Sequence, residues 1–193
     1  MNAPQETRAV LNTAGFAHPP RNVAALDIQP GMMIADFGSG SGAYVFAIAE
    51  KLSGKGEVYA VDVQRDLLRK IHNEAHKRGL TSVRIIWGDL EKPTGSKLLD
   101  RSCDLVLISN LLFQVDEKAR LFEEAGRILK PDGRLAIIDW QDSFGGMGPI
   151  DEKVVTKDAA LQLAKDAGMG LEKEFEAGEH HYGLVLSFKG RQI

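Results

Sequence analysis

The stretch Ile34-Ala35-Asp36-Phe37-Gly38-Ser39-Gly40-Ser41-Gly42-Ala43 contains the pattern that decides the fold of this chain. Residues 32–37 are mostly apolar and predict a strand, glycine then stands at every second position, and a helix is expected to begin near Ala43. Glycine tolerates the positive φ angles of a sharp strand-to-helix turn and leaves no side chain between backbone and ligand. The free N–H groups of the helix's first turn favour anionic groups. The turn therefore predicts a site for a nucleotide-like or carboxylate-bearing cofactor.

Length and composition indicate a single folded unit. The chain has 193 residues, of which 44% are hydrophobic and 26% charged, enough for one domain with a full core. We expect one domain over residues 1–193, with residues 1–20 as an N-terminal tail or flap and residues 28–190 as the core. The net charge of -3 argues against a nucleic-acid partner held by phosphate contacts.

Cysteine content and hydropathy further limit the kinds of protein that this chain can be. Cys103 is the one cysteine, which excludes an internal disulfide and any multi-cysteine metal site, and we expect no metal. The N-terminus has no basic region followed by an apolar one, so no secretory signal is predicted. We expect a cytoplasmic protein without membrane insertion. The oligomeric state is not predicted.

Strands and helices alternate along the chain. Strands are expected at residues 32–37, 57–63, 82–87, 103–108, 134–140, 171–177 and 182–189, with helices at 43–52, 65–78, 116–129 and 156–167. Lys130-Pro131-Asp132-Gly133 predicts a turn before the fifth strand. This alternation predicts an α/β fold: a Rossmann-like, doubly wound, seven-stranded sheet with helices on both faces. The last two strands are close enough for a hairpin, which makes one strand antiparallel.

Polar residues stand at the ends of the first four predicted strands, where ligands bind in such sheets. Asp62 lies about twenty residues beyond the glycine loop, where a carboxylate can accept the hydroxyl groups of a ribose; capping the next helix is the weaker alternative. Asp89 follows the third strand, either as an acceptor for an adenine amino group or as a turn former. Asn110 follows the fourth. Asp36 is expected to accept N–H groups of the glycine loop.

Five stretches, in this order along the chain, resemble the motifs of the class I S-adenosylmethionine-dependent methyltransferases. They are the glycine loop with Asp36, Val58-Tyr59-Ala60-Val61-Asp62, Ile86-Trp87-Gly88-Asp89-Leu90, Cys103-Asp104-Leu105-Val106-Leu107-Ile108-Ser109-Asn110 and Arg127-Ile128-Leu129-Lys130-Pro131-Asp132-Gly133-Arg134-Leu135. The likeness covers residues 28–190 and is greatest to small members of the ubiquinone/menaquinone-methyltransferase-like group.

The resemblance implies S-adenosylmethionine as cofactor and S-adenosylhomocysteine as product. Gly38, Ser39, Gly40 and Gly42 would pack against the methionine part of the cofactor. Asp62 would bind the ribose, Asp89 following Gly88 the adenine amino group, and Val63 and Leu90 the ring. Asn110 and Leu111 would lie near the sulfonium. The implied reaction is in-line methyl transfer to a small-molecule acceptor.

The sequence departs from the family pattern after the fourth strand. Many of these relatives have a histidine pair there, whereas this chain has Leu112-Phe113-Gln114, so no general base is visible and the catalytic residues are unknown. The single Cys103 also argues against an arsenite methyltransferase, which would need several thiolates.

Six residues outside the motifs are candidates for the acceptor side: Phe16, His18, Phe113, Gln114, Trp140 and Phe144. Most are aromatic, which predicts a small, partly apolar acceptor. His180 and His181 invite a metal interpretation, but no carboxylate cluster stands at ligand spacing, and we interpret them as hairpin residues.

Two alternatives remain open. A nicotinamide-dependent oxidoreductase also has a glycine pattern of this kind, with alanine in the last position. A non-catalytic binding protein of the same fold would keep the cofactor site and lack a base.

Overall fold

The computed structural model describes residues 17–144, 146 and 148–188, so Phe16 and the rest of residues 1–16 lie outside it. The strands are β1 (Met33–Phe37), β2 (Glu57–Asp62), β3 (Val83–Trp87), β4 (Cys103–Ser109), β5 (Leu129–Trp140), β6 (Met169–Gly178) and β7 (His181–Phe188). The helices are α1 (Pro19–Ala24), α2 (Ala43–Leu52), α3 (Arg65–Lys77), α4 (Lys118–Ile128) and α5 (Lys157–Asp166), with short 3-10 turns η2 (Leu112–Gln114) and η3 (Asp151–Lys153). The predicted alternation is confirmed.

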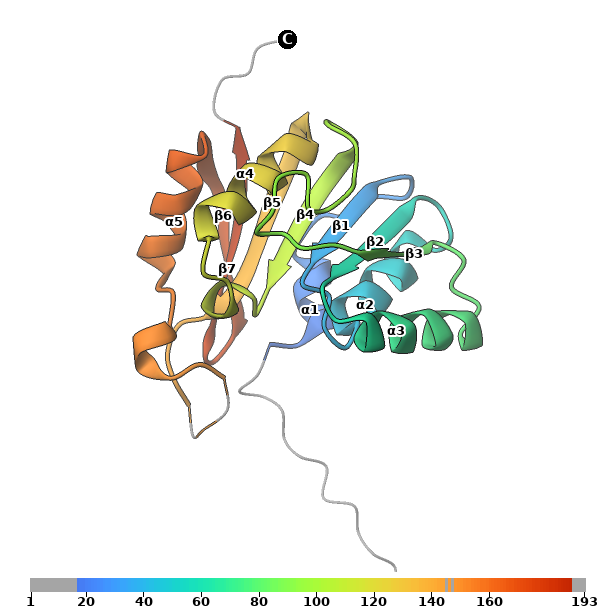
Figure 1. Cartoon of the computed structure of the whole chain (residues 1–193), viewed down its shortest axis with the longest axis horizontal. Coiled ribbons are helices and arrows are strands. Elements are labelled where there is room, and N and C mark those ends of the chain that lie inside the picture. Colours follow the sequence, from blue (N-terminus) through green and yellow to red (C-terminus); the bar gives the residue numbers. More distant parts are fainter. Residues whose placement is uncertain (1–16, 145, 147, 189–193) are drawn as a thin grey trace, which may run out of the picture.

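The seven strands form one sheet in the order β3-β2-β1-β4-β5-β7-β6, which crosses the molecule in Figure 1. Strands β1 to β5 pair in parallel, whereas β7 is antiparallel to both β5 and β6. The predicted single antiparallel strand is therefore confirmed, next to the edge. Strand order reverses between β1 and β4, and ligands of such sheets bind at that point, beyond the carboxyl ends of the two strands.

Helices cover both faces of the sheet. Residues of α1, α2 and α3 pack with Leu105 and Leu107 of β4 on one face, and residues of α4 and α5 pack with Val106 and Ile108 on the other. Because β4 is buried on both faces, its sequence is a nearly continuous apolar run instead of an alternating one.

The predicted turn at Lys130–Gly133 is wrong. Strand β5 begins at Leu129 and includes these residues, with a register shift against β4 between Cys103 and Leu105. Pro131 is accommodated because it is exposed in this irregular stretch, whereas Gly133 is buried at a close approach where a Cβ would lie 3.0 Å from Cys103 O. Among the described residues, no helix has the length and apolar character to cross a membrane.

Candidate functional site

The glycine loop joins β1 to α2 through residues in left-handed backbone conformations. The φ angles of Gly38, Gly40 and Gly42 are 70°, 50° and 85°, values that side-chain-bearing residues adopt with strain. The N–H groups of Gly38 and Ser39 both donate to Val61 O, at 2.8 and 3.1 Å, so the loop is attached to the end of β2. Gly42 is the N-cap of α2, and the free N–H groups of that helix begin at the loop.

Asp62 completes this attachment. Its Oδ2 accepts the N–H of Gly40 at 2.9 Å and its Oδ1 accepts the N–H of Gln64 at 2.8 Å. The side chain is only 6% exposed, and each carboxylate oxygen keeps a lone pair for a further donor. Asp62 therefore holds the glycine loop in place and, with its remaining lone pairs, can also accept hydrogen bonds from a ligand.

The expectation that Asp36 accepts N–H groups of the loop is wrong. Asp36 is 1% exposed, and neither of its carboxyl oxygens has a hydrogen-bond partner among the described residues. Strand alternation turns this side chain toward the face that α2 covers, whereas the loop N–H groups point to the end of β2. Burial, and then the charge of Asp62, raise the pKa of Asp36 to about 8, so the carboxyl group is mostly protonated at neutral pH.

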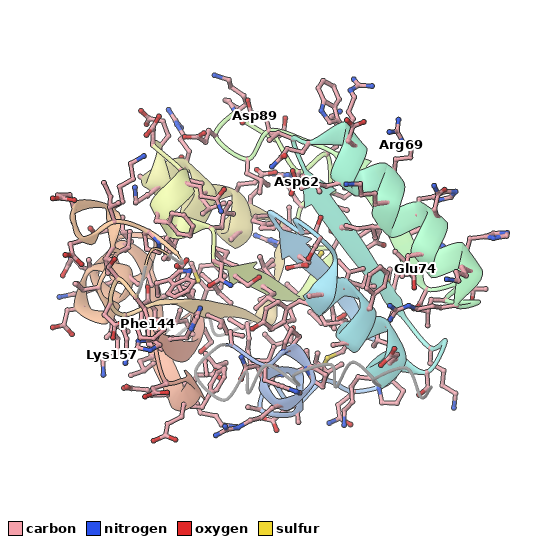
Figure 2. The ribbon with its side chains drawn as sticks, turned by 90° about the horizontal axis from the view of Figure 1, so that it is seen from below. Asp62, Arg69, Glu74, Asp89, Phe144 and Lys157 are labelled. Atoms are coloured by element: carbon pink, nitrogen blue, oxygen red, sulfur yellow. The ribbon has the colours of Figure 1, made fainter. Side chains whose placement is uncertain are left out.

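One cavity, of about 180 Å³, opens beside Asp62 at the ends of β1, β2 and β3. It is lined by Gly38, Gly40, Asp62, Val63, Gln64, Gly88, Asp89, Leu90, Glu91, Leu111, Gln114 and Val115. Asp62 and Asp89 come from different strands and lie on the same side of the molecule (Figure 2). Most of the predicted cofactor residues thus meet in one place; Gln64, Glu91 and Val115 were not predicted.

The wall that carries Asp89 depends on a close backbone approach. A Cβ on Gly88 would lie 2.3 Å from Gly95 O, so no larger residue fits without moving the chain. Asp89 Oδ1 accepts the N–H of Glu91 at 3.1 Å, which holds the carboxylate in a turn and leaves its other oxygen for a ligand.

A second cavity, of about 280 Å³, lies on the other side of the loop and shares Gly38, Gly40 and Gln114 with the first. Its other lining residues are Ala17, Pro19, Ser39, Ser41, Ala43, Tyr44, Ser109 and Asn110. The Oγ of Ser39 is buried without a partner in the described part of the chain. Together the cavities fall within about 300–1,000 Å³, the usual range of small-molecule sites.

The segment after β4 is held by Asp139, whose role the sequence did not reveal. Asp139 Oδ2 accepts the N–H groups of Leu111 and Leu112 at 3.1 and 2.9 Å, and Oδ1 accepts that of Trp140 at 2.8 Å. Burial raises the pKa of Asp139 to about 6, against the lowering effect of these donors. These hydrogen bonds to Asp139 hold Leu111 over the glycine loop, where a Cβ on Gly38 would lie 2.7 Å from Leu111 Cδ1.

Only one described acceptor-side candidate lines these cavities. Gln114 lines both and donates from Nε2 to Asn110 O at 2.8 Å. His18 is exposed and caps α1, where its Nδ1 accepts the N–H of Arg21 at 3.4 Å. Phe113 is half-buried and lines neither cavity.

The other two candidates, Trp140 and Phe144, pack against the hairpin histidines. Trp140 is 7% exposed, with its ring centroid 4.3 Å from that of His181. Phe144 stacks on His180 at 4.0 Å, far from Asp62 and Asp89 in Figure 2. His180 Nδ1 also lies 2.7 Å from Asp142 Oδ1, so the loop after β5 is attached to the hairpin turn.

A larger cavity lies elsewhere. It has a volume of about 660 Å³, lies along β6 and the turn to β7, and includes no residue of the glycine loop. Size alone therefore does not locate the site. Among the described residues no group of three or more histidine, cysteine, aspartate or glutamate side chains is placed to hold a metal ion.

Comparison with known proteins fits this geometry. Residues 28–180 match the family model described as a methyltransferase domain. The crystal structure of an S-adenosylmethionine-dependent methyltransferase from Aquifex aeolicus superposes with a TM-score of 0.79 at 27% identity, covering 88% of this chain and 89% of that one. This chain belongs to the class I S-adenosylmethionine-dependent methyltransferase family.

Curated relatives of this methyltransferase domain act on different acceptors, by their names. An arsenite methyltransferase from Halobacterium salinarum is 29% identical over 120 residues, which is 62% of this chain and 29% of the relative. A ubiquinone/menaquinone biosynthesis C-methyltransferase from Bordetella parapertussis is 27% identical over 165 residues, or 78% of this chain and 62% of the relative. The chain thus spans less than two thirds of either relative. The family model, the Aquifex structure and these relatives do not favour the oxidoreductase or the non-catalytic alternative.

Proposed function

We propose that this chain transfers a methyl group from S-adenosylmethionine to a small-molecule acceptor. The observation that supports this most is the placement of Asp62, which bridges the glycine loop and offers two free acceptor positions to the adjoining cavity. A ribose presents two neighbouring hydroxyl groups, which a single carboxylate can bind together.

The residues around both cavities fit the cofactor. Chain neighbours aside, the only atom of the described residues within 4 Å of a Cβ built on Gly40 is Gly38 O at 3.8 Å, so the loop backbone is open to a ligand. Asp89 would accept from the adenine amino group, with Val63 and Leu90 against the ring. Ser39, which lines the second cavity, supplies a buried hydroxyl group that has no partner among the described residues, whereas Asp36 lines neither cavity. Asn110 and Leu111 would lie beside the sulfonium.

Bound S-adenosylmethionine would supply an electrophilic methyl group. The chain's own contribution is positioning and exclusion of water, which can account for much of the rate of a displacement. No Asp, Glu, His, Lys or Cys lines the second cavity among the described residues, and burial raises the pKa of Tyr44 far above neutrality. The acceptor in this proposal is a group that is nucleophilic without a dedicated base among the described residues.

The acceptor is a small organic molecule in this proposal, and arsenite is not. Cys103 lies in β4 with no exposed surface, and burial raises the pKa of its thiol to about 11. A thiol in that state neither reaches nor binds arsenite. We propose further that the chain acts as one domain and, given its net charge of -3, without nucleic acid.

Thermal unfolding tests the cofactor assignment. S-adenosylmethionine, S-adenosylhomocysteine and NAD are each added in excess to the full chain. A ligand at about a hundred times its Kd stabilises the native state by about 2.7 kcal/mol. That corresponds to a rise in midpoint of roughly 5–11 °C for a chain of this size, at 2–4 °C for each kcal/mol. We expect the midpoint to rise with the two adenosyl sulfur compounds and not with NAD. A shift with NAD alone, or no shift with either sulfur compound, would refute the proposal.

A further inference from the structure

His181, which the sequence suggested was only a hairpin residue, reaches the end of β4. Its Nε2 lies 3.0 Å from Oδ1 of Asn110. Strand β7 pairs with β5, which in turn pairs with β4, and His181 lies opposite Trp140 in this register. The imidazole rests on the Trp140 ring and is 3% exposed. The contact with Asn110 is therefore made by a side chain that the sheet itself holds in place.

The ring of His181 is neutral at physiological pH. Burial, and then the charge of His180, lower the pKa of His181 to about 4. Nδ1 is buried and has no hydrogen-bond partner in the described part of the chain, so a protonated ring would leave a donor unsatisfied there. An amide oxygen only accepts, so the single proton of the neutral ring is on Nε2 and is donated to Asn110 Oδ1.

This hydrogen bond determines which end of the Asn110 amide is available. His181 takes one lone pair of the oxygen and thereby fixes the orientation of the amide, while Nδ2 donates to no described residue. Asn110 lines the second cavity, beside Gly38 and Gly40. Its backbone is held independently, since its N–H donates to Ile138 O at 2.9 Å and its carbonyl accepts from Gln114. With φ of 49°, the residue has a conformation that few side-chain-bearing residues adopt.

We propose that His181 is a positioning residue that fixes the Asn110 amide so that Nδ2 donates to an oxygen atom of the methyl acceptor. The acceptor class is then a small molecule with a hydrogen-bond-accepting oxygen at or next to the methylated atom, such as a phenol or an enol, whose proton passes to solvent. This inference rests on the proposed function, because it places the acceptor next to the sulfonium, at the part of the second cavity that Asn110 lines. The competing role for Nδ2 is a bond to the cofactor itself.

Equilibrium binding separates these roles without turnover. The full chain is saturated with S-adenosylhomocysteine and titrated with phenol or with toluene, which has nearly the same volume and no oxygen. The same titrations are made with His181→Phe, which keeps an aromatic ring against Trp140, and with His181→Gln, which restores a donor. The imidazole tautomer and the Asn110 side-chain amide are followed by ¹⁵N NMR.

We expect wild type to bind phenol up to about tenfold more tightly than toluene, the effect of one hydrogen bond. The preference should fall below about twofold in His181→Phe and return in His181→Gln, with S-adenosylhomocysteine affinity unchanged in all three. Phenol, and not toluene, should shift the Asn110 amide resonances, and Nε2 should carry the ring proton.

Four results would overturn the inference: no preference for phenol in wild type, the same preference in His181→Phe, a proton on Nδ1, or cofactor affinity that falls with the histidine. Failure of S-adenosylhomocysteine to bind wild type would instead refute the proposed function.

Discussion

Replacing Asp36 by asparagine should change how stability depends on pH. Asp36 is buried in β1 without a hydrogen-bond partner among the described residues, and its pKa rises from 3.8 to about 8 on folding. Between these values the native state holds a proton that the unfolded chain has lost. Stability from this group is therefore complete below pH 3.8 and is lost as pH rises toward 8. The Asp36→Asn variant has no ionisable group at this position and so escapes the loss.

The size of the effect follows from the width of the pH range between the unfolded and folded pKa values of Asp36. Each pH unit inside it costs wild type about 1.4 kcal/mol relative to the variant. From pH 5 to pH 7 the variant should therefore gain roughly 2–3 kcal/mol on wild type, and the difference should level off above pH 8. Asp139, whose pKa also rises, is present in both proteins, so its contribution cancels in the difference.

Urea unfolding at intervals of one pH unit from 5 to 9 measures this difference. Asp132→Asn, at an exposed position near the beginning of β5, is the matched control for the loss of a carboxyl group and should change stability by less than about 0.5 kcal/mol. A difference between Asp36→Asn and wild type that stays constant with pH would refute the reasoning, because Asp36 would then titrate alike in the folded and unfolded chains.

Three further predictions follow from the site and the core. Asp62→Ala removes two charge-assisted hydrogen bonds and should lower stability by about 2–4 kcal/mol. It should also weaken S-adenosylhomocysteine binding about a hundredfold, as measured by calorimetry, with Asp66→Ala on the exposed face of α3 as the control. Equal affinities in the two variants would contradict the ribose assignment. Gly88→Ala places a Cβ 2.3 Å from Gly95 O and should cost roughly 1–3 kcal/mol in urea unfolding, and an unchanged midpoint would show that the backbone yields freely. Cys103 should react with a thiol reagent only at the rate of unfolding, because the thiol is buried with a pKa of about 11; rapid labelling of the native protein would disprove this.

Much of the fold could be predicted because its signals are local. The apolar run at residues 103–108 predicted a doubly buried strand, and β4 is Cys103–Ser109. The distance along the chain from the glycine loop to Asp62 was enough to place that carboxylate at the loop, since neighbouring parallel strands end at the same edge. Such inferences need only the periodicity of apolar residues, the glycines and prolines that end elements, and the rule that ligands bind at the carboxyl ends of parallel strands.

The rest depends on which way side chains point and which strands become neighbours. That Gly40 donates to Asp62 and not to Asp36 depends on the face to which each carboxyl group is directed. The hairpin was recognisable, but nothing local indicated that its second strand would insert beside β5. His181 reaches Asn110, 71 residues earlier in the chain, only because of that insertion.

The position of β7 also delays completion of the sheet while the chain is being synthesised. β6 has one hydrogen-bonded neighbour, β7, and β7 is made after it, so β6 cannot join the sheet when it is synthesised. Until then the outer edge of β5 is unpaired, and an open edge is a template for pairing with other chains. From residue 140 to residue 188 a ribosome needs roughly 2–10 s at about 5–20 residues per second. During those seconds the longest strand of the described residues has one edge exposed, and pairing of that edge with another chain competes with folding.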